Sequence, residues 1–90
     1  NGYIELTILV TPKGNIHQRP ILTFRGLPIS QIDEFVNGLE DQIESTTKTF
    51  SLNSKKQETN LIDALKIVCR KYSKEKTGKK PFTNINLVRI

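Results

Sequence analysis

Apolar and polar residues alternate at the start of the chain and predict a half-buried strand from Tyr3 to Val10. Successive side chains of a strand point to opposite faces, so one face carries Ile4, Leu6, Ile8 and Val10, and the other carries Tyr3, Glu5, Thr7 and Leu9. Proline, glycine and asparagine within residues 11–15 are typical of a turn. The run Ile21–Arg25 is then the returning arm of a hairpin. Pro20 beside it cannot donate to a ladder, so this end of the arm is expected to be frayed or to lie at an edge.

A helix is predicted next, because apolar residues recur every three to four positions. Ser30 offers its side-chain oxygen as an N-cap, and Asp33 and Glu34 favour the positive end of the helix dipole. The apolar stripe consists of Ile32, Phe35, Val36, Leu39 and Ile43. The opposite side is polar and includes Asn37, Glu40, Asp41 and Glu44.

Residues 45–54 are rich in serine, threonine and asparagine, which compete with a helical backbone for hydrogen bonds, so they predict a connection in which Phe50 and Leu52 pack inward. A second helix is predicted to begin at about Lys56 or Thr59 and to end at about Lys76. Gly78 is expected to take the left-handed conformation that ends this helix. The apolar stripe consists of Leu61, Leu65, Val68 and Tyr72, with Ile62 and Cys69 beside it.

A last strand is predicted over residues 82–90, with Ile85 and Leu87 on one face and Phe82, Val88 and Ile90 on the other. Asn84 and Asn86 are expected to weaken it. The order strand, strand, helix, helix, strand (β-β-α-α-β) predicts an α+β fold, a two-layer sandwich whose three-stranded mixed sheet is covered on one face by two antiparallel helices. The third strand should run parallel to the first and pair with the first or the second. The other face of the sheet is left for a neighbour.

Charge adds a second feature to this fold. The 90 residues carry a formal net charge of +5. Residues 55–80 hold nine basic and three acidic residues, a local +6, whereas the rest of the chain holds five basic and six acidic residues, or −1. On the second helix Lys66, Arg70 and Lys74 recur every four residues on the side opposite the apolar stripe. With Lys79 and Lys80 they are candidate contacts to RNA phosphates, and the alternative is a solvated face that keeps the domain soluble.

Few groups are suited to catalysis or metal binding. Cys69, the single cysteine, adjoins an apolar stripe and is expected to be a buried structural thiol, and the single histidine, His17, is expected at the surface without a role. Phosphate-binding glycine loops and serine elbows are absent from the sequence. We therefore expect no catalytic residue, no metal site and no cofactor here, and no apolar run is long enough for a membrane span.

The known RNA-binding modules fit poorly. Residues 45–54 contain no glycine, which argues against the Gly-x-x-Gly loop of a KH domain. Most of the six aromatic residues occupy apparent core positions, which argues against the aromatic platform of an RRM. Any contact with RNA is therefore expected to be electrostatic.

Two blocks of the chain resemble a known family. Asp63-Ala64-Leu65, Tyr72, Glu75-Lys76-Thr77, the pair Lys79-Lys80, Pro81 and a terminal strand resemble the C-terminal end of bacterial-type ribonuclease J. The run Pro20-Ile21-Leu22-Thr23-Phe24-Arg25-Gly26 is similar to that family's block in which a proline precedes an apolar strand ending in Arg-Gly. The two blocks cover about half of the chain in the expected order.

The resemblance implies a parent protein of the metallo-β-lactamase and β-CASP type, a cytoplasmic zinc-dependent hydrolase that processes and degrades RNA as an endonuclease and 5′ to 3′ exonuclease. None of the zinc-ligand motifs of that family is in this chain. Residues 1–90 are therefore expected to form a single C-terminal accessory domain of a larger ribonuclease, without catalytic activity of its own. Zinc is expected in the catalytic domain of the parent.

Three hypotheses for the role of the chain follow. The first is association, either as a homo-oligomer or with the parent's own catalytic domains, through the uncovered sheet face at Tyr3, Leu9, Phe82 and Val88. The second is guidance of RNA along the basic helix. The third is an unrelated, stand-alone basic protein that associates with RNA.

Overall fold

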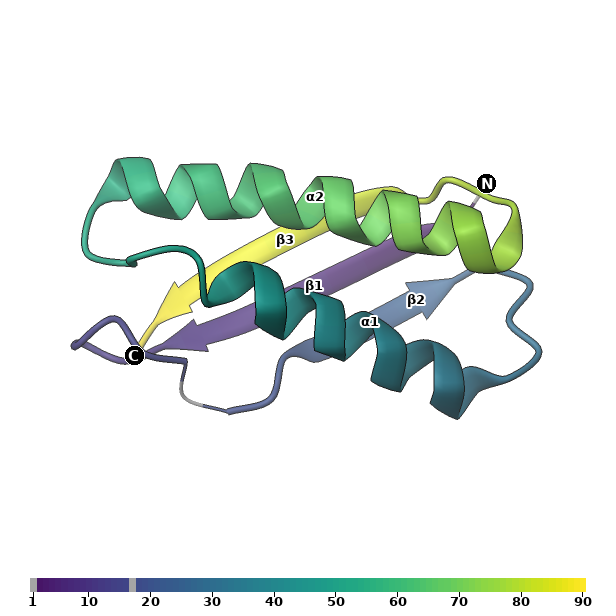
Figure 1. Ribbon diagram of the computed structural model, residues 1–90, viewed down its shortest axis with the longest axis horizontal. Helices are drawn as coiled ribbons and strands as arrows, with labels where there is room; N and C mark the ends of the chain where they lie inside the picture. Colours follow the sequence, from purple (N-terminus) through teal and green to yellow (C-terminus); the bar gives the residue numbers. More distant parts are fainter. Residues whose placement is uncertain (1, 17) are drawn as a thin grey trace.

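Five elements follow one another in the computed structural model, which describes residues 2–16 and 18–90 (Figure 1). His17, expected at the surface, lies outside the described residues. The elements are β1 (Tyr3–Val10), β2 (Ile21–Arg25), α1 (Ile32–Thr47), α2 (Lys55–Thr77) and β3 (Phe82–Arg89). In the sheet β1 lies between the other two strands, antiparallel to β2 and parallel to β3. The predicted α+β fold and strand directions are confirmed, and the strand that pairs with β3 is β1.

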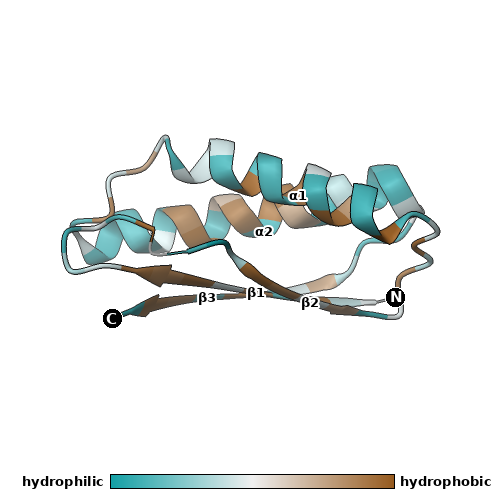
Figure 2. Cartoon of the chain, turned by 90° about the horizontal axis from the view of Figure 1, so that it is seen from below, coloured by the Kyte–Doolittle hydropathy of each residue, from teal (hydrophilic) through white to brown (hydrophobic). Residues whose placement is uncertain are grey.

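Both helices cover the same face of the sheet, so the protein has two layers (Figure 2). Residues at even positions of β1 point into the space between the layers and are at most 1% exposed. They meet Phe35, Leu39 and Ile43 of α1, and Leu61, Leu65 and Cys69 of α2, in one hydrophobic core. Phe50 is half-buried and Leu52 is buried, as predicted. Burial of these apolar surfaces is the main force that holds the helices on the sheet.

Helix α2 has a defined cap at each end. The backbone N–H of Gln57 donates to the hydroxyl of Ser54 over 3.2 Å, so the helix begins at Lys55, slightly earlier than predicted. Gly78 has φ 76°, and its N–H donates to the Lys74 carbonyl over 2.9 Å. Because this left-handed conformation suits glycine, Gly78 ends the helix as the sequence predicts.

Helix α1 differs from the prediction at both ends. Gln31 rather than Ser30 is the N-cap, and no side chain caps the helix there. At the other end the helix continues to Thr47, whose hydroxyl donates to the Ile43 carbonyl of the same helix over 2.7 Å. Ile32, expected in the apolar stripe, is 53% exposed. The buried part of that stripe starts one turn later, at Phe35.

The two helices are joined by an aromatic contact at a glycine. The ring of Phe35 lies edge-on between those of Phe24 and Tyr72, with centroids 5.7 and 5.2 Å away. The Tyr72 hydroxyl donates to the Phe35 carbonyl over 3.1 Å. It passes over Gly38, where an added Cβ would lie only 2.2 Å from the hydroxyl oxygen. Gly38 therefore allows α2 to approach α1 closely at this point.

The buried hydroxyl of Ser73 lacks a hydrogen-bond partner among residues 2–16 and 18–90. The Ser73 side chain is 0% exposed, and among the described residues its hydroxyl makes no hydrogen bond. We expect Ser73→Ala to raise the free energy of unfolding by about 1 kcal/mol, because it removes an unsatisfied hydroxyl and favours the helix. Urea unfolding of the purified variant measures this change.

Thr47→Val is the matched control, since it removes a buried hydroxyl that does have a partner. That variant is expected to be neutral or less stable than the parent. A Ser73→Ala protein that unfolds at lower urea than the parent would contradict the prediction.

Candidate functional site

The side of the sheet that faces away from the helices is uncovered, and we call it the open face (Figure 2). Four residues of β1 point to it, and the parallel register places a residue of β3 beside each of them. These pairs are Tyr3 with Phe82, Glu5 with Asn84, Thr7 with Asn86, and Leu9 with Val88. Strand β2 adds Ile21, Thr23 and Arg25. The four residues predicted for association therefore all lie on the open face.

Tyr3 and Phe82 form the aromatic end of the open face. Their ring centroids are 5.9 Å apart and their planes differ by 11°, so the rings are stacked. Phe82 begins an edge strand and is 72% exposed, which is unusual for so large an apolar side chain. Arg25 is paired with Tyr3 in the antiparallel register.

Glu5, Thr7, Asn84 and Asn86 form a polar strip across the middle of the open face. The amides of Asn84 and Asn86 both donate to Glu5 Oε2, over 3.3 and 3.0 Å, and the Asn86 amide also lies 3.3 Å from the Thr7 hydroxyl. The asparagines were expected to weaken the strand. In the structure their side chains link β3 to β1, because the register places them beside acceptors.

Leu9 and Val88 form the aliphatic end of the open face. Val88 is 41% exposed, and Ile90 follows it, its N–H donating to the Val10 carbonyl over 3.0 Å. In the described part of the chain, seven large hydrophobic side chains are exposed: Ile16, Ile21, Ile32, Ile67, Phe82, Val88 and Ile90. Four of the seven belong to β2 and β3 or follow directly after β3, so exposed apolar surface is concentrated at the sheet rather than over the helices.

The helix layer separates charge between its two members. Helix α1 contains five acidic residues and no basic one, whereas α2 contains seven basic and three acidic residues. Lys66, Arg70 and Lys74 are exposed on α2, as predicted, and Lys79 and Lys80 are exposed just after it. Lys74 Nζ lies 3.4 Å from the Gly78 carbonyl, and Lys76 Nζ lies 5.7 Å from the Tyr72 ring centroid. The molecule thus has a basic helix beside an acidic one.

Cys69 is completely buried, as predicted, and burial raises the pKa of its thiol to about 12. A thiol in this environment remains protonated and is a poor nucleophile. Within residues 2–16 and 18–90, no three acidic, histidine or cysteine side chains come together in a group that could hold a metal ion. In the same residues no helix is long and apolar enough to span a membrane.

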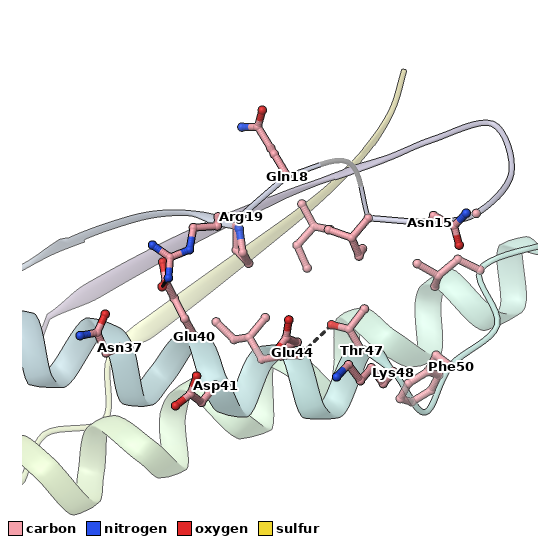
Figure 3. Close-up of a pocket in the computed structure, with 16 residues that line it drawn as sticks. Asn15, Gln18, Arg19, Asn37, Glu40, Asp41, Glu44, Thr47, Lys48 and Phe50 are labelled. Atoms are coloured by element: carbon pink, nitrogen blue, oxygen red, sulfur yellow. Dashed lines mark hydrogen bonds and ion pairs between the residues drawn. The ribbon is translucent and has the colours of Figure 1, made fainter.

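A cavity of about 740 Å³ lies between the loop that follows β1 and helix α1 (Figure 3). Arg19 reaches from the loop toward α1, where its guanidinium lies 3.6 Å from a carboxylate oxygen of Glu40. Gln18 points away from the helix (Figure 3). Since Arg19 is largely exposed, this ion pair adds little stability.

Sequence reasoning located the apolar ends of the open face but missed its polar strip. Asn84 and Asn86 stand two residues apart on the predicted outer face of the last strand, and Glu5 and Thr7 stand two apart on that of the first. The predicted parallel pairing of these strands was the signal that could have brought the four side chains together.

The family model for the ribonuclease J C-terminal domain matches residues 1–90, the whole chain. This match confirms the resemblance that the blocks around Arg25 and Lys76 indicate. No curated protein matches the chain.

Proposed function

Because the chain belongs to the ribonuclease J C-terminal domain family, we propose that it is an accessory domain whose open face associates with another ribonuclease subunit or with the catalytic domains. In this proposal the hydrolysis of RNA, and the zinc it requires, belong to those catalytic domains. The observation that supports it is the concentration of exposed apolar side chains at the sheet, above all Phe82 at 72% exposure. Apolar surface of this kind is typical of sites that a partner covers.

The size of the open face sets the expected strength of association. Eight residues at about 3.3 Å and three strands at about 4.8 Å give a footprint of about 26 by 14 Å. A patch of this size buries less accessible surface than the roughly 800 Å² per partner of a standard protein interface. We therefore expect the chain alone to associate weakly, with a dissociation constant of about 0.1 to 1 mM. Further contacts in the whole ribonuclease would strengthen the assembly.

NMR spectra of the chain between about 50 µM and 2 mM test the association. Amide shifts that change with concentration are expected on β1 and β3, and the double variant Phe82→Ser, Val88→Ser should abolish them. Its matched control is Ile32→Ser, Ile67→Ser, which removes two apolar side chains of similar exposure from the helices and should leave the shifts unchanged.

The same two double variants, placed in the whole ribonuclease, test association with the catalytic domains. We expect the double variant Phe82→Ser, Val88→Ser to assemble more weakly and the control variant to assemble as the parent does. Two results together would contradict the proposal: the chain alone stays monomeric at about 2 mM, and neither double variant changes the assembly of the whole ribonuclease.

Guidance of RNA along α2 is a second candidate function, and the charge separation between the helices favours it. Phosphates are attracted to α2 and repelled by α1, so a single strand would follow the row Lys66, Arg70 and Lys74 toward Lys79 and Lys80. Contacts of this kind bind any sequence and weaken with salt.

Reversing the charge of Arg70 and Lys74 to glutamate is expected to weaken binding of a short single-stranded RNA about tenfold at low salt. It should also reduce the slope of log affinity against log salt by about 1 to 1.5, because two phosphate contacts are lost. Fluorescence anisotropy measures both quantities. Lys13→Glu, Lys48→Glu is the matched control, since both pairs lower the net charge from +5 to +1. An equal loss of affinity in the two variants would exclude a track on α2.

A further inference from the structure

The open face has a direction along its strands. The aromatic end comes first, then the two pairs of the polar strip, and the aliphatic end comes last. Among the eight residues of these four pairs only Glu5 carries a formal charge. Its carboxylate already accepts two amide hydrogen bonds from β3. The face is therefore apolar at both ends and polar in the middle.

We propose that a second copy of this chain covers the open face, with its strands antiparallel to those of the first. This inference rests on the proposed association and specifies its partner and geometry. The aromatic end of each copy then packs on the aliphatic end of the other. Stacked rings meet branched side chains, and the polar strips of the two copies face each other.

Symmetry leaves two ways to pack identical sheets face to face. The two-fold axis lies between the sheets and runs either across the strands or along them, with some rotation from sheet twist. An axis along the strands places the two Glu5 carboxylates opposite each other in a region that excludes water. Like charges in such a place repel strongly. It also places Arg25 of each copy over Phe82 of the other, a contact at the rim that solvent weakens.

An axis across the strands weakens this repulsion, because it offsets the two carboxylates by two residues, or about 6.6 Å, along the strands. It places the pair Glu5 and Asn84 of one copy over the pair Thr7 and Asn86 of the other. Glu5 then faces Thr7, and Asn84 faces Asn86. A carboxylate then meets a hydroxyl that can donate to it, and the amides of the asparagines can donate and accept. The pattern is self-complementary in this direction, which is what an isologous interface requires.

A nitroxide tag at one end of the open face tests the direction. Arg25→Cys places a reactive thiol beside the aromatic end, whereas buried Cys69 is not expected to react. Tagged, unlabelled chain is mixed with untagged ¹⁵N-labelled chain at about 2 mM, so any broadening is intermolecular. Broadening is expected at the amides around Leu9 and Val88, and the reciprocal tag at Ile90→Cys should broaden those around Tyr3 and Phe82. Parent chain treated with the tag is the control and should give none.

The alternative outcomes separate this inference from the proposed function. Broadening from the Arg25→Cys tag around Tyr3 and Phe82 would overturn the antiparallel arrangement but leave association through the open face intact. Broadening confined to the helices would overturn both. No intermolecular broadening would overturn the second copy as partner, and the assembly of the whole ribonuclease with Phe82→Ser, Val88→Ser then decides the proposed function.

Discussion

Gly38→Ala is expected to destabilise the protein by about 2 kcal/mol, although the same change in an ordinary helix stabilises by about 1 kcal/mol. The added Cβ would lie 2.2 Å from the Tyr72 hydroxyl oxygen and 3.1 Å from the ring carbon that bears it. Tyr72 would have to move, and it would lose its hydrogen bond to the Phe35 carbonyl. Overpacking and the lost bond together outweigh the gain in helix propensity. Urea unfolding followed by circular dichroism measures the change.

Tyr72→Phe provides the test of this mechanism. Without the hydroxyl, the closest remaining atom to the added Cβ is 3.1 Å away, a contact that a small shift relieves. Gly38→Ala should therefore lower the free energy of unfolding much less in the Tyr72→Phe protein than in the parent. The expected difference, measured by a double-mutant cycle, is about 1 to 2 kcal/mol. Asn37→Ala, at the exposed neighbouring position, is the control and should have a small effect. Additive effects of Gly38→Ala and Tyr72→Phe would contradict the contact.

Local patterns of the sequence predicted the strands well. The bounds of β1 and β2 are those that alternation and turn residues indicate, because a period of two decides which side chains face the core. The predicted end of α1 was wrong. Serine and threonine favour loops on average, whereas the Thr47 hydroxyl donates to a carbonyl of its own helix. Composition could not distinguish these two uses of a hydroxyl.

Contacts between distant segments were beyond local patterns. Gly38 is needed only because Tyr72, 34 residues later, crosses α1 there. The apolar ends of the open face follow from alternation within one strand, and both were predicted. The polar strip depends on the register between β1 and β3, which are about 80 residues apart in sequence. A shift of one residue would turn Asn84 and Asn86 toward the helices.

The two candidate functions use opposite sides of the molecule. The open face lies on one side of the sheet and the basic row of α2 on the other, beyond the hydrophobic core (Figure 2). Variants at Phe82 and Val88 therefore should not alter RNA binding by α2, and variants at Arg70 and Lys74 should not alter association. Each function can thus be removed while the other is measured.

Alkaline pH is expected to destabilise the chain through Cys69. Its thiol has an ordinary pKa of 9.0 when the chain is unfolded, and burial raises the pKa to about 12 in the fold. Below pH 9 both states hold the proton and the group has no effect on stability. Above pH 9 the unfolded state releases the proton while the folded state keeps it, so stability falls as pH rises toward 12. Between pH 8.5 and 10.5 this loss is about 2 kcal/mol.

Cys69→Ala isolates this effect, because it removes the titrating thiol at the cost of a small cavity that does not depend on pH. Burial, together with the carboxylates of Asp41 and Glu34, also raises the pKa of Tyr72, so some alkaline loss should persist in the variant. The expected result from urea unfolding under reducing conditions is a steeper decline for the parent than for Cys69→Ala. Parallel curves above pH 9 would mean that the folded thiol ionises as easily as the unfolded one, and Cys69 would then be accessible to solvent rather than enclosed by the core.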